Sequence, residues 1–276
     1  MNPTIILDQK IYQKNDFTPF ALTDILTEYS KKNNQNFLHF WQYEQTVILG
    51  MKDTRTRYFH EGIQELRKAG YQPIVRNAGG LGIISDQGVL NISLIFPQNE
   101  QEKISIDAAY EKMLTLTRLA FPTVSIEAFE VTHSYCPGTY DLSINGKKFA
   151  GIAQRRIKNG ISVMMYVSVN GAQQTRGQAM KRFYQEALKE DFGTNGYPAV
   201  VPESMATLAD LLETPLTIED VKQQFQLALT QLYGESRSVD ALCWKEAHVT
   251  SEQWTDQINR MEERNKLKEL ADDYSL

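Results

Sequence analysis

A three-stranded meander is indicated by residues 140–169, YDLSINGKKFAGIAQRRIKNGISVMMYVSV. Asn145-Gly146 and Asn159-Gly160 divide this stretch into three, and Asn-Gly readily adopts the positive φ angles of a two-residue hairpin turn. If Asn145 and Gly146 are the turn residues, alternation predicts four cross-strand pairs: Ile144 with Lys147, Ser143 with Lys148, Leu142 with Phe149 and Asp141 with Ala150. These residues therefore predict an antiparallel sheet at the centre of the fold.

Further strands and helices are predicted on both sides of the meander. Runs of aromatic and β-branched residues predict strands over 37–44, 46–50, 72–77 and 89–96. Apolar residues at three- and four-residue spacing predict helices over 19–32, 61–70, 106–121, 176–192, 207–213, 216–234 and 251–270. The fold class is thus α+β, with a mixed or antiparallel sheet, flanking helices and a helical C-terminal part.

Local signals also mark element ends and a change of character along the chain. Thr217 with Asp220 predicts a helix N-cap, and Gly70 and Gly234 predict helix ends. The sequence turns from mixed to helical near NGYPAVVP, residues 195–202. We therefore expect a catalytic domain over 1–195 and a helical C-terminal segment over 196–276, either separate or packed on the same domain.

Composition excludes several classes of function. The chain has 276 residues, of which 29 are Lys or Arg and 34 are Asp or Glu, so the net charge is −5. A mildly acidic chain is a poor nonspecific ligand for nucleic acid, which needs clustered basic charge to displace counterions. Without a long apolar run or a signal-peptide pattern, the sequence predicts a cytoplasmic protein that does not bind membranes. Two cysteines and four scattered histidines give neither a disulfide framework nor a metal-ligand spacing, so no metal is expected.

A glycine-rich loop is the first candidate site. It lies in RNAGGLGIISDQGVLNIS, residues 76–93, where Gly79, Gly80 and Gly82 follow a predicted strand. Glycines let backbone N–H groups approach an acyl carbonyl or a phosphate, and Arg76 adds a charged donor. The segment is neither a P-loop nor a dinucleotide-binding motif. The alternative interpretation is an ordinary tight turn with a solvated arginine.

Cys136 is the second candidate. It precedes Pro137-Gly138, a turn dipeptide, so its thiol is expected to be accessible rather than buried within a strand. His133 lies three residues before it and is either a general base or a surface imidazole. Cys243, beside Trp244, is expected to fill the core and has no assigned role.

A pair of lysines opens the second strand of the meander. Lys147 is expected to be solvated at the hairpin tip, whereas Lys148 shares a face with Asp141 and Ser143. Gly151 follows on the same strand and leaves space for a ligand. The alternative interpretation is two charged residues that mark the end of a hairpin.

At these positions the sequence resembles the lipoate and octanoate transferase superfamily, whose catalytic domain is shared by biotin and lipoate protein ligases. The glycine-rich segment 76–93 is similar to its acyl-binding motif, and GKKFAG, residues 146–151, resembles its lysine motif, with the lysine at Lys148. SYCPGTYDLSINGKKFAGIAQRR, residues 134–156, resembles the amidotransferase branch that takes octanoyl groups from the glycine cleavage H protein. The resemblance implies a biotin/lipoate protein ligase-like domain.

The resemblance also implies residue roles and partners. Cys136 would take the octanoyl group from a lysine of the octanoylated H protein as a thioester and pass it to a lipoyl domain of a 2-oxoacid dehydrogenase E2 subunit. Lys148 would favour the thiolate, and five residues would bind substrate: Arg76, Gly79, Gly80, Asn91 and Gly151. Because one lysine amide replaces another, no ATP or other cofactor is expected.

Two related activities remain alternatives. An octanoyltransferase branch that uses octanoyl acyl carrier protein also has an early cysteine, although its glycine loop differs from RNAGGLG. Lipoate protein ligases activate the free acid with ATP and commonly have three consecutive glycines where this chain has Gly79-Gly80-Leu81. A carrier that binds lipoyl domains without chemistry is the non-enzymatic alternative.

Overall fold

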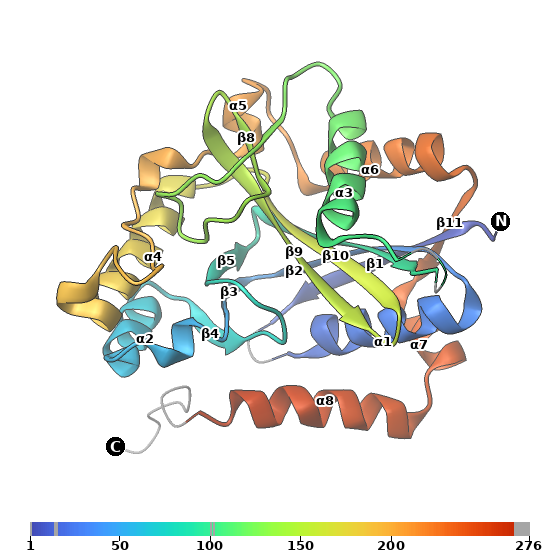
Figure 1. Cartoon of the computed structure of the whole chain (residues 1–276), viewed down its shortest axis with the longest axis horizontal. Helices are drawn as coiled ribbons and strands as arrows, with labels where there is room; N and C mark the ends of the chain where they lie inside the picture. The colour runs from blue at the N-terminus through green and yellow to red at the C-terminus, as the bar shows by residue number, and fades with distance from the viewer. Residues whose placement is uncertain (1, 14–15, 100, 102, 268–276) are drawn as a thin grey trace.

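The computed structural model describes residues 2–13, 16–99, 101 and 103–267, and Figure 1 shows their arrangement around one large sheet. That sheet has eight strands in the order β11-β1-β2-β6-β10-β9-β8-β7. In the same order the strands span Ser236–Asp240, Thr4–Tyr12, Phe37–Tyr43, Val89–Pro97, Gly160–Ser168, Lys147–Ile157, Asp141–Ile144 and Glu127–Ala128. β1 pairs in parallel with β2 and β11, and all other neighbours are antiparallel. The expected mixed sheet with flanking helices is confirmed.

A second, three-stranded sheet lies beside the large one. Its order is β4-β3-β5, with β4 over Gln72–Val75, β3 over Gln45–Leu49 and β5 over Ile83–Asp86. The glycine-rich loop connects β4 to β5. Strands β1, β5, β7 and β11 were not predicted from the sequence.

Eight α-helices surround the two sheets within the described part of the chain (Figure 1). They are α1 (Thr18–Asn33), α2 (Phe59–Lys68), α3 (Ile106–Ala120), α4 (Gln173–Leu188), α5 (Leu208–Leu211), α6 (Ile218–Tyr233), α7 (Ala241–His248) and α8 (Ser251–Asn265). Helices α3 and α6 pack on one face of the large sheet, α1 and α7 on the other, and α2 and α4 enclose the small sheet. The predicted end of the last helix, 268–270, lies outside the described residues.

The predicted helix cap, helix end and first hairpin turn are found in the structure. Thr217 and Asp220 form a capping box at the start of α6, and Gly234, with φ +78°, ends it. Asn145 and Gly146 have φ angles of 53° and 73°, so they form the predicted tight turn of the β8–β9 hairpin. At the next turn the two positive φ angles belong to Lys158 and Asn159, one residue earlier than the Asn-Gly pair.

The hairpin register is only partly as predicted. Ile144 pairs with Lys147 and Ser143 with Lys148. Beyond them a bulge shifts the ladder, so Leu142 pairs with Ala150 and Asp141 with Gly151, and the predicted pairs with Phe149 and Ala150 are wrong. The extra residue places Phe149 and Ala150 in one buried apolar cluster with Leu142. Lys148, which is 1% exposed, contacts Asp141 and Ser134 instead.

The chain beyond residue 195 completes the large sheet and its core. Strand β11 lies at the edge beside β1, and Val221, Phe225 and Leu229 of α6 belong to the same buried cluster as Phe121 of the N-terminal part. The expectation that Cys243 fills the core is wrong, because its side chain is exposed, whereas Ala241 and Trp244 of α7 are buried. Consecutive residues of a helix point in directions about 100° apart, so Cys243 and Trp244 face different surroundings.

Candidate active site

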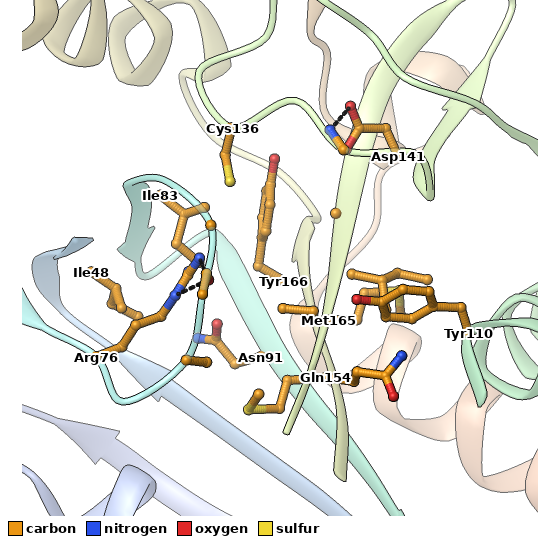
Figure 2. A pocket seen from close by; sticks show the side chains of 18 of the residues that line it. Ile48, Arg76, Ile83, Asn91, Tyr110, Cys136, Asp141, Gln154, Met165 and Tyr166 are labelled. Atoms are coloured by element: carbon orange, nitrogen blue, oxygen red, sulfur yellow. Dashed lines mark hydrogen bonds between the residues drawn. The ribbon is translucent and has the colours of Figure 1, made fainter. Parts of the chain in front are cut away.

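A cavity of about 280 Å³ lies where the small sheet, the loop before β8 and strands β9 and β10 meet (Figure 2). Its wall is largely apolar and includes Phe20, Trp41, Ile48, Ile83, Met164 and Met165. Figure 2 shows Cys136 and Tyr166 at one end and Tyr110 and Gln154 toward the other. Six of the predicted site residues line it: Arg76, Gly79, Gly80, Asn91, Cys136 and Gly151. The topology thus gathers these separated motifs around one space that suits an apolar chain.

The thiol of Cys136 faces the glycine-rich loop. Cys136 lies in the loop between β7 and β8 and is half-buried, as expected for a cysteine before a turn. Its Sγ donates to the Leu81 carbonyl oxygen at 3.3 Å, and a Cβ on Gly80 would lie 3.7 Å from the sulfur. A half-buried thiol therefore lies at one end of an apolar cavity.

Arg76 shapes the glycine-rich loop from within. Its Nε and Nη2 donate to the Gly79 carbonyl at 3.1 and 2.6 Å, which closes the loop on itself. Gly80 has φ +91°, and a Cβ there would lie 2.6 Å from the guanidinium, so this position requires glycine on both counts. The arginine is 8% exposed and not the solvated side chain of the alternative interpretation.

A polar cluster holds the same loop from outside the cavity. Arg155 of β9 donates from Nε and Nη2 to the Asp24 carboxylate of α1 at 2.8 and 3.0 Å. Its Nη1 donates to the Asn77 carbonyl at 2.7 Å, and the Asn77 amide donates to Asp24 at 2.9 Å. The loop is thus fixed to two elements of the large-sheet layer.

Lys148 lies behind the cavity wall and does not contact the thiol. Its Nζ forms an ion pair with Asp141 at 2.7 Å, donates to Ser134 Oγ at 3.1 Å and donates to the backbone carbonyl of Cys136. Burial raises the pKa of Asp141, and the Lys148 ammonium and the N–H groups of Val131 and Gly138 oppose that rise. The lysine therefore links strand β9 to the main chain at Cys136.

Asn91 and Gly151 occupy the floor of the cavity. Asn91 is 2% exposed and donates to Ser85 Oγ at 2.9 Å. A Cβ on Gly151 would lie 2.8 Å from the Tyr166 ring and 3.3 Å from Lys148 Nζ. Gly151 therefore allows the Tyr166 ring and the lysine to pack side by side, a role that its sequence position does not reveal.

His133 lies at the surface, where its Nδ1 is 3.3 Å from the Ala199 carbonyl. Sequence reasoning singled out neither Tyr166 nor Arg155, and it missed two fully buried polar residues near the loop, Asp53 and Tyr184. Burial raises the pKa of Asp53 to about 7. Only the pairing of Lys148 with Asp141 had a local signal, because the predicted hairpin places both on one face.

The fold and the thiol beside an apolar cavity define an acyl-binding catalytic domain. The model of the lipoyl protein ligase A/B catalytic domain matches residues 15–230, and the chain belongs to this family. Within it, the chain groups with octanoyl-[GcvH]:protein N-octanoyltransferases. It is 43% identical over 248 residues to that of Exiguobacterium sibiricum, covering 89% of this chain and 88% of the relative. It is 40% identical over 254 residues to that of Staphylococcus aureus, covering 90% and 88%. The family expected from the motifs is confirmed.

Solved structures show the same fold at low sequence identity. A lipoate-protein ligase A bound with ATP aligns with a TM-score of 0.67 at 15% identity, covering 95% of this chain and 94% of that one. A bipartite lipoate protein ligase from Thermoplasma acidophilum aligns with a TM-score of 0.62 at 16% identity, covering 95% and 92%. The biotin/lipoate protein ligase-like architecture is therefore confirmed. Among the described residues, no helix is both long and apolar enough to cross a membrane.

Proposed function

We propose that this chain is an acyltransferase that moves an octanoyl group from a lysine of GcvH, the glycine cleavage H protein, to a lysine on the lipoyl domain of a 2-oxoacid dehydrogenase E2 subunit. The observation that carries the proposal is the half-buried Cys136 thiol at one end of an apolar cavity. The names of relatives at about 40% identity over most of the chain support GcvH as the donor. We place this reaction in the cytoplasm.

In the first step the Cys136 sulfur attacks the amide carbonyl of the octanoyl-lysine. A C–S bond forms, the C–N bond breaks, and the lysine amine leaves with the proton that the thiol gave up. As the carbonyl oxygen gains charge, backbone N–H groups of Gly79 and Gly80 stabilise it, because both glycines line the cavity that Cys136 also lines. Arg76 keeps this loop closed through the Gly79 carbonyl.

In the second step the lysine amine of the acceptor domain attacks the thioester. The new C–N bond forms, the C–S bond breaks, and the proton from the amine returns to the sulfur. One amide has replaced another, so the cycle needs no ATP and no other cofactor. The apolar side chains of Trp41, Ile48 and Met164 hold the acyl chain in both steps.

Lys148 acts in this proposal as a positioning residue. Its ammonium is paired with Asp141, so the pair brings no net charge to the thiol, and its other bonds end on Ser134 and on the Cys136 carbonyl. It therefore favours reaction by fixing the backbone from which the nucleophile projects.

The test is intact-mass analysis after mixing the protein with octanoylated GcvH, followed by hydroxylamine and peptide mapping. We expect a hydroxylamine-labile octanoyl adduct on Cys136, no adduct in Cys136→Ser, and a normal adduct in the control Cys243→Ser, which removes an exposed thiol on α7. Transfer from the isolated adduct to a lipoyl domain checks the second step. Full transfer activity in Cys136→Ser would overturn the mechanism.

Two further donors separate the alternatives in the same assay. An adduct from octanoyl acyl carrier protein but not from GcvH would assign the chain to the acyl-carrier-protein branch. Pyrophosphate release with octanoate and ATP would assign it to the ligases.

A further inference from the structure

Gly82 belongs to the glycine-rich loop but has no role in the proposed chemistry. It directly follows Leu81, whose carbonyl accepts a hydrogen bond from the Cys136 thiol. The Leu81 carbonyl and the Gly82 N–H belong to the same peptide unit. On its carbonyl side the unit accepts from Sγ at 3.3 Å, and on its N–H side it donates to the Tyr184 hydroxyl oxygen at 3.3 Å. Any rotation of this peptide moves both contacts together, because the unit is planar.

Tyr184 is itself fixed by a buried carboxylate. Its hydroxyl donates to Asp53 Oδ1 at 2.9 Å, and Asp53 Oδ2 accepts from the Gly50 N–H at 2.8 Å. Both Asp53 and Tyr184 are 0% exposed. A buried carboxyl group is costly unless hydrogen-bonded, and these two bonds give each oxygen of Asp53 a donor.

The identity of Gly82 follows from the same packing. A Cβ there would lie 2.8 Å from Met180 Cε and 3.5 Å from Asp53 Oδ2. Met180 and Tyr184 are four residues apart on α4, so they project from one face of that helix. Both side chains therefore lie against the Leu81–Gly82 segment, and a side chain at position 82 would require Met180 to shift.

We propose that Tyr184 and Asp53 are positioning residues that clamp the Leu81–Gly82 peptide and thereby set the orientation of the Cys136 thiol for acyl transfer. This inference rests on the proposed function, in which Cys136 is the nucleophile. The clamp joins four separate segments of the chain: the turn after β3, the glycine-rich loop, the loop before β8, and α4. It lies beneath the loop and away from the acyl chain, so its effect is on the rate of attack and not on donor binding.

The test compares Tyr184→Phe with Tyr197→Phe. The first removes only the oxygen that joins Gly82 to Asp53. The second removes the hydroxyl of a ring that packs against Tyr184 but donates to the Lys52 carbonyl at 2.9 Å and to neither Asp53 nor Gly82. With octanoylated GcvH as donor, we expect the saturating rate of Cys136 acylation to fall at least about fivefold in Tyr184→Phe, because one net hydrogen bond is lost. The KM for the donor should stay within about twofold, and Tyr197→Phe should match the wild type in both values.

Alkylation by iodoacetamide supplies a readout that a merely structural role would not move. Peptide mapping follows Cys136 and Cys243 in the same molecule, and the exposed Cys243 serves as internal standard. We expect the ratio of Cys136 to Cys243 alkylation to rise in Tyr184→Phe, since the sulfur is no longer held against the Leu81 carbonyl, and to be unchanged in Tyr197→Phe. An unchanged ratio with an unchanged acylation rate would overturn the inference.

Asp53→Asn is the second variant. Its one remaining oxygen accepts from Tyr184 or from Gly50 but cannot replace both carboxylate oxygens, so a smaller loss of acylation rate is expected. If Tyr184→Phe does not fold, a normal rate in folded Asp53→Asn overturns the clamp. Failure of the proposed function is recognised separately, because it would appear as retained transfer activity in Cys136→Ser whatever the Tyr184 variant does.

Discussion

At the scale of single residues, Lys148 is a motif residue whose contacts lie behind the cavity and include the backbone of Cys136. Its charge is neutralised by Asp141, and its other donors end on Ser134 and the Cys136 backbone. The β8–β9 hairpin places Lys148 opposite Ser143, on the face that also carries Asp141. We therefore expect substitutions of Lys148 to change both the stability of the protein and the reactivity of Cys136.

Lys148→Met is expected to destabilise the protein by about 3–5 kcal/mol, because it leaves the Asp141 carboxyl buried without its cation. Acylation of Cys136 should fall as well, since the Cys136 carbonyl loses its donor. Urea unfolding and thioester formation, measured on the same preparation, check both effects.

The double variant Lys148→Met with Asp141→Asn is the control for this prediction. Removing the orphaned charge should restore part of the lost unfolding free energy, while thioester formation stays slow. Equal rates in the double variant and the wild type would show that Lys148 contributes stability only.

At the scale of elements, the glycine-rich loop depends on α1 and β9. Arg155 donates to Asp24 and to the Asn77 carbonyl, so it joins the loop to both elements. Arg156 is its sequence neighbour, but it donates to the carbonyls of Ile104 and Ser105, away from the loop. The two arginines form a matched pair for testing the loop.

Arg155→Met is expected to increase amide hydrogen exchange in residues 77–82 by about tenfold or more, because loss of charged hydrogen bonds costs about 1.5–3 kcal/mol. The KM for octanoylated GcvH should rise, since a looser loop must be ordered on binding. Hydrogen-exchange mass spectrometry and steady-state kinetics measure these effects. Arg156→Met should leave both values near those of the wild type, and the prediction fails if the two variants behave alike.

At the scale of the whole molecule, the segment after residue 195 shares the core of the segment before it. Val221, Phe225 and Leu229 are buried against the N-terminal part, and β11 pairs with β1. Truncation after residue 195 is therefore expected to abolish cooperative unfolding, because it exposes one face of the large sheet. Circular dichroism and urea titration of the truncated chain provide the test. A cooperative transition would instead show that residues 1–195 fold alone.

The free energy of unfolding should depend on pH through two buried groups, Asp53 and His39, whose effects have opposite signs. Burial raises the pKa of Asp53 to about 7, so the folded protein keeps a proton that the unfolded chain releases near its usual pKa of 3.8. The stability that Asp53 contributes is fully present below pH 3.8 and is lost as the pH rises toward 7. Burial lowers the pKa of His39 to about 3, so the unfolded chain takes up a proton below about 6.5 and stability is lost as pH falls.

The two slopes oppose each other between about pH 4 and 6.5, each at up to about 1.4 kcal/mol per pH unit. The free energy of unfolding of the wild type minus that of Asp53→Asn should therefore fall as pH rises. The same difference taken against His39→Gln should increase with pH. Urea unfolding across this range measures both, and parallel profiles for all three proteins would contradict the assignment.

The sequence by itself determined the meander, the capping box of α6, the helix end at Gly234 and the residues of the cavity motifs. These depend on interactions between near neighbours in the sequence. They are turn residues that tolerate positive φ, side chains that cap their own helix, and glycines that let the backbone approach a ligand closely. The resemblance to known acyltransferases rests on the same short segments. The fold class and the family could therefore be predicted from the amino-acid sequence alone.

Only the tertiary structure decided the bulge at Phe149, the parallel pairing of β11 with β1, the partners of Lys148, and the contact of Tyr184 with Asp53 and Gly82. Asp53 and Tyr184 are 131 positions apart, and neither lies in a motif or beside a turn signal. Such contacts form because separate elements bury their apolar faces together, and the polar groups enclosed in the process must then find partners among themselves.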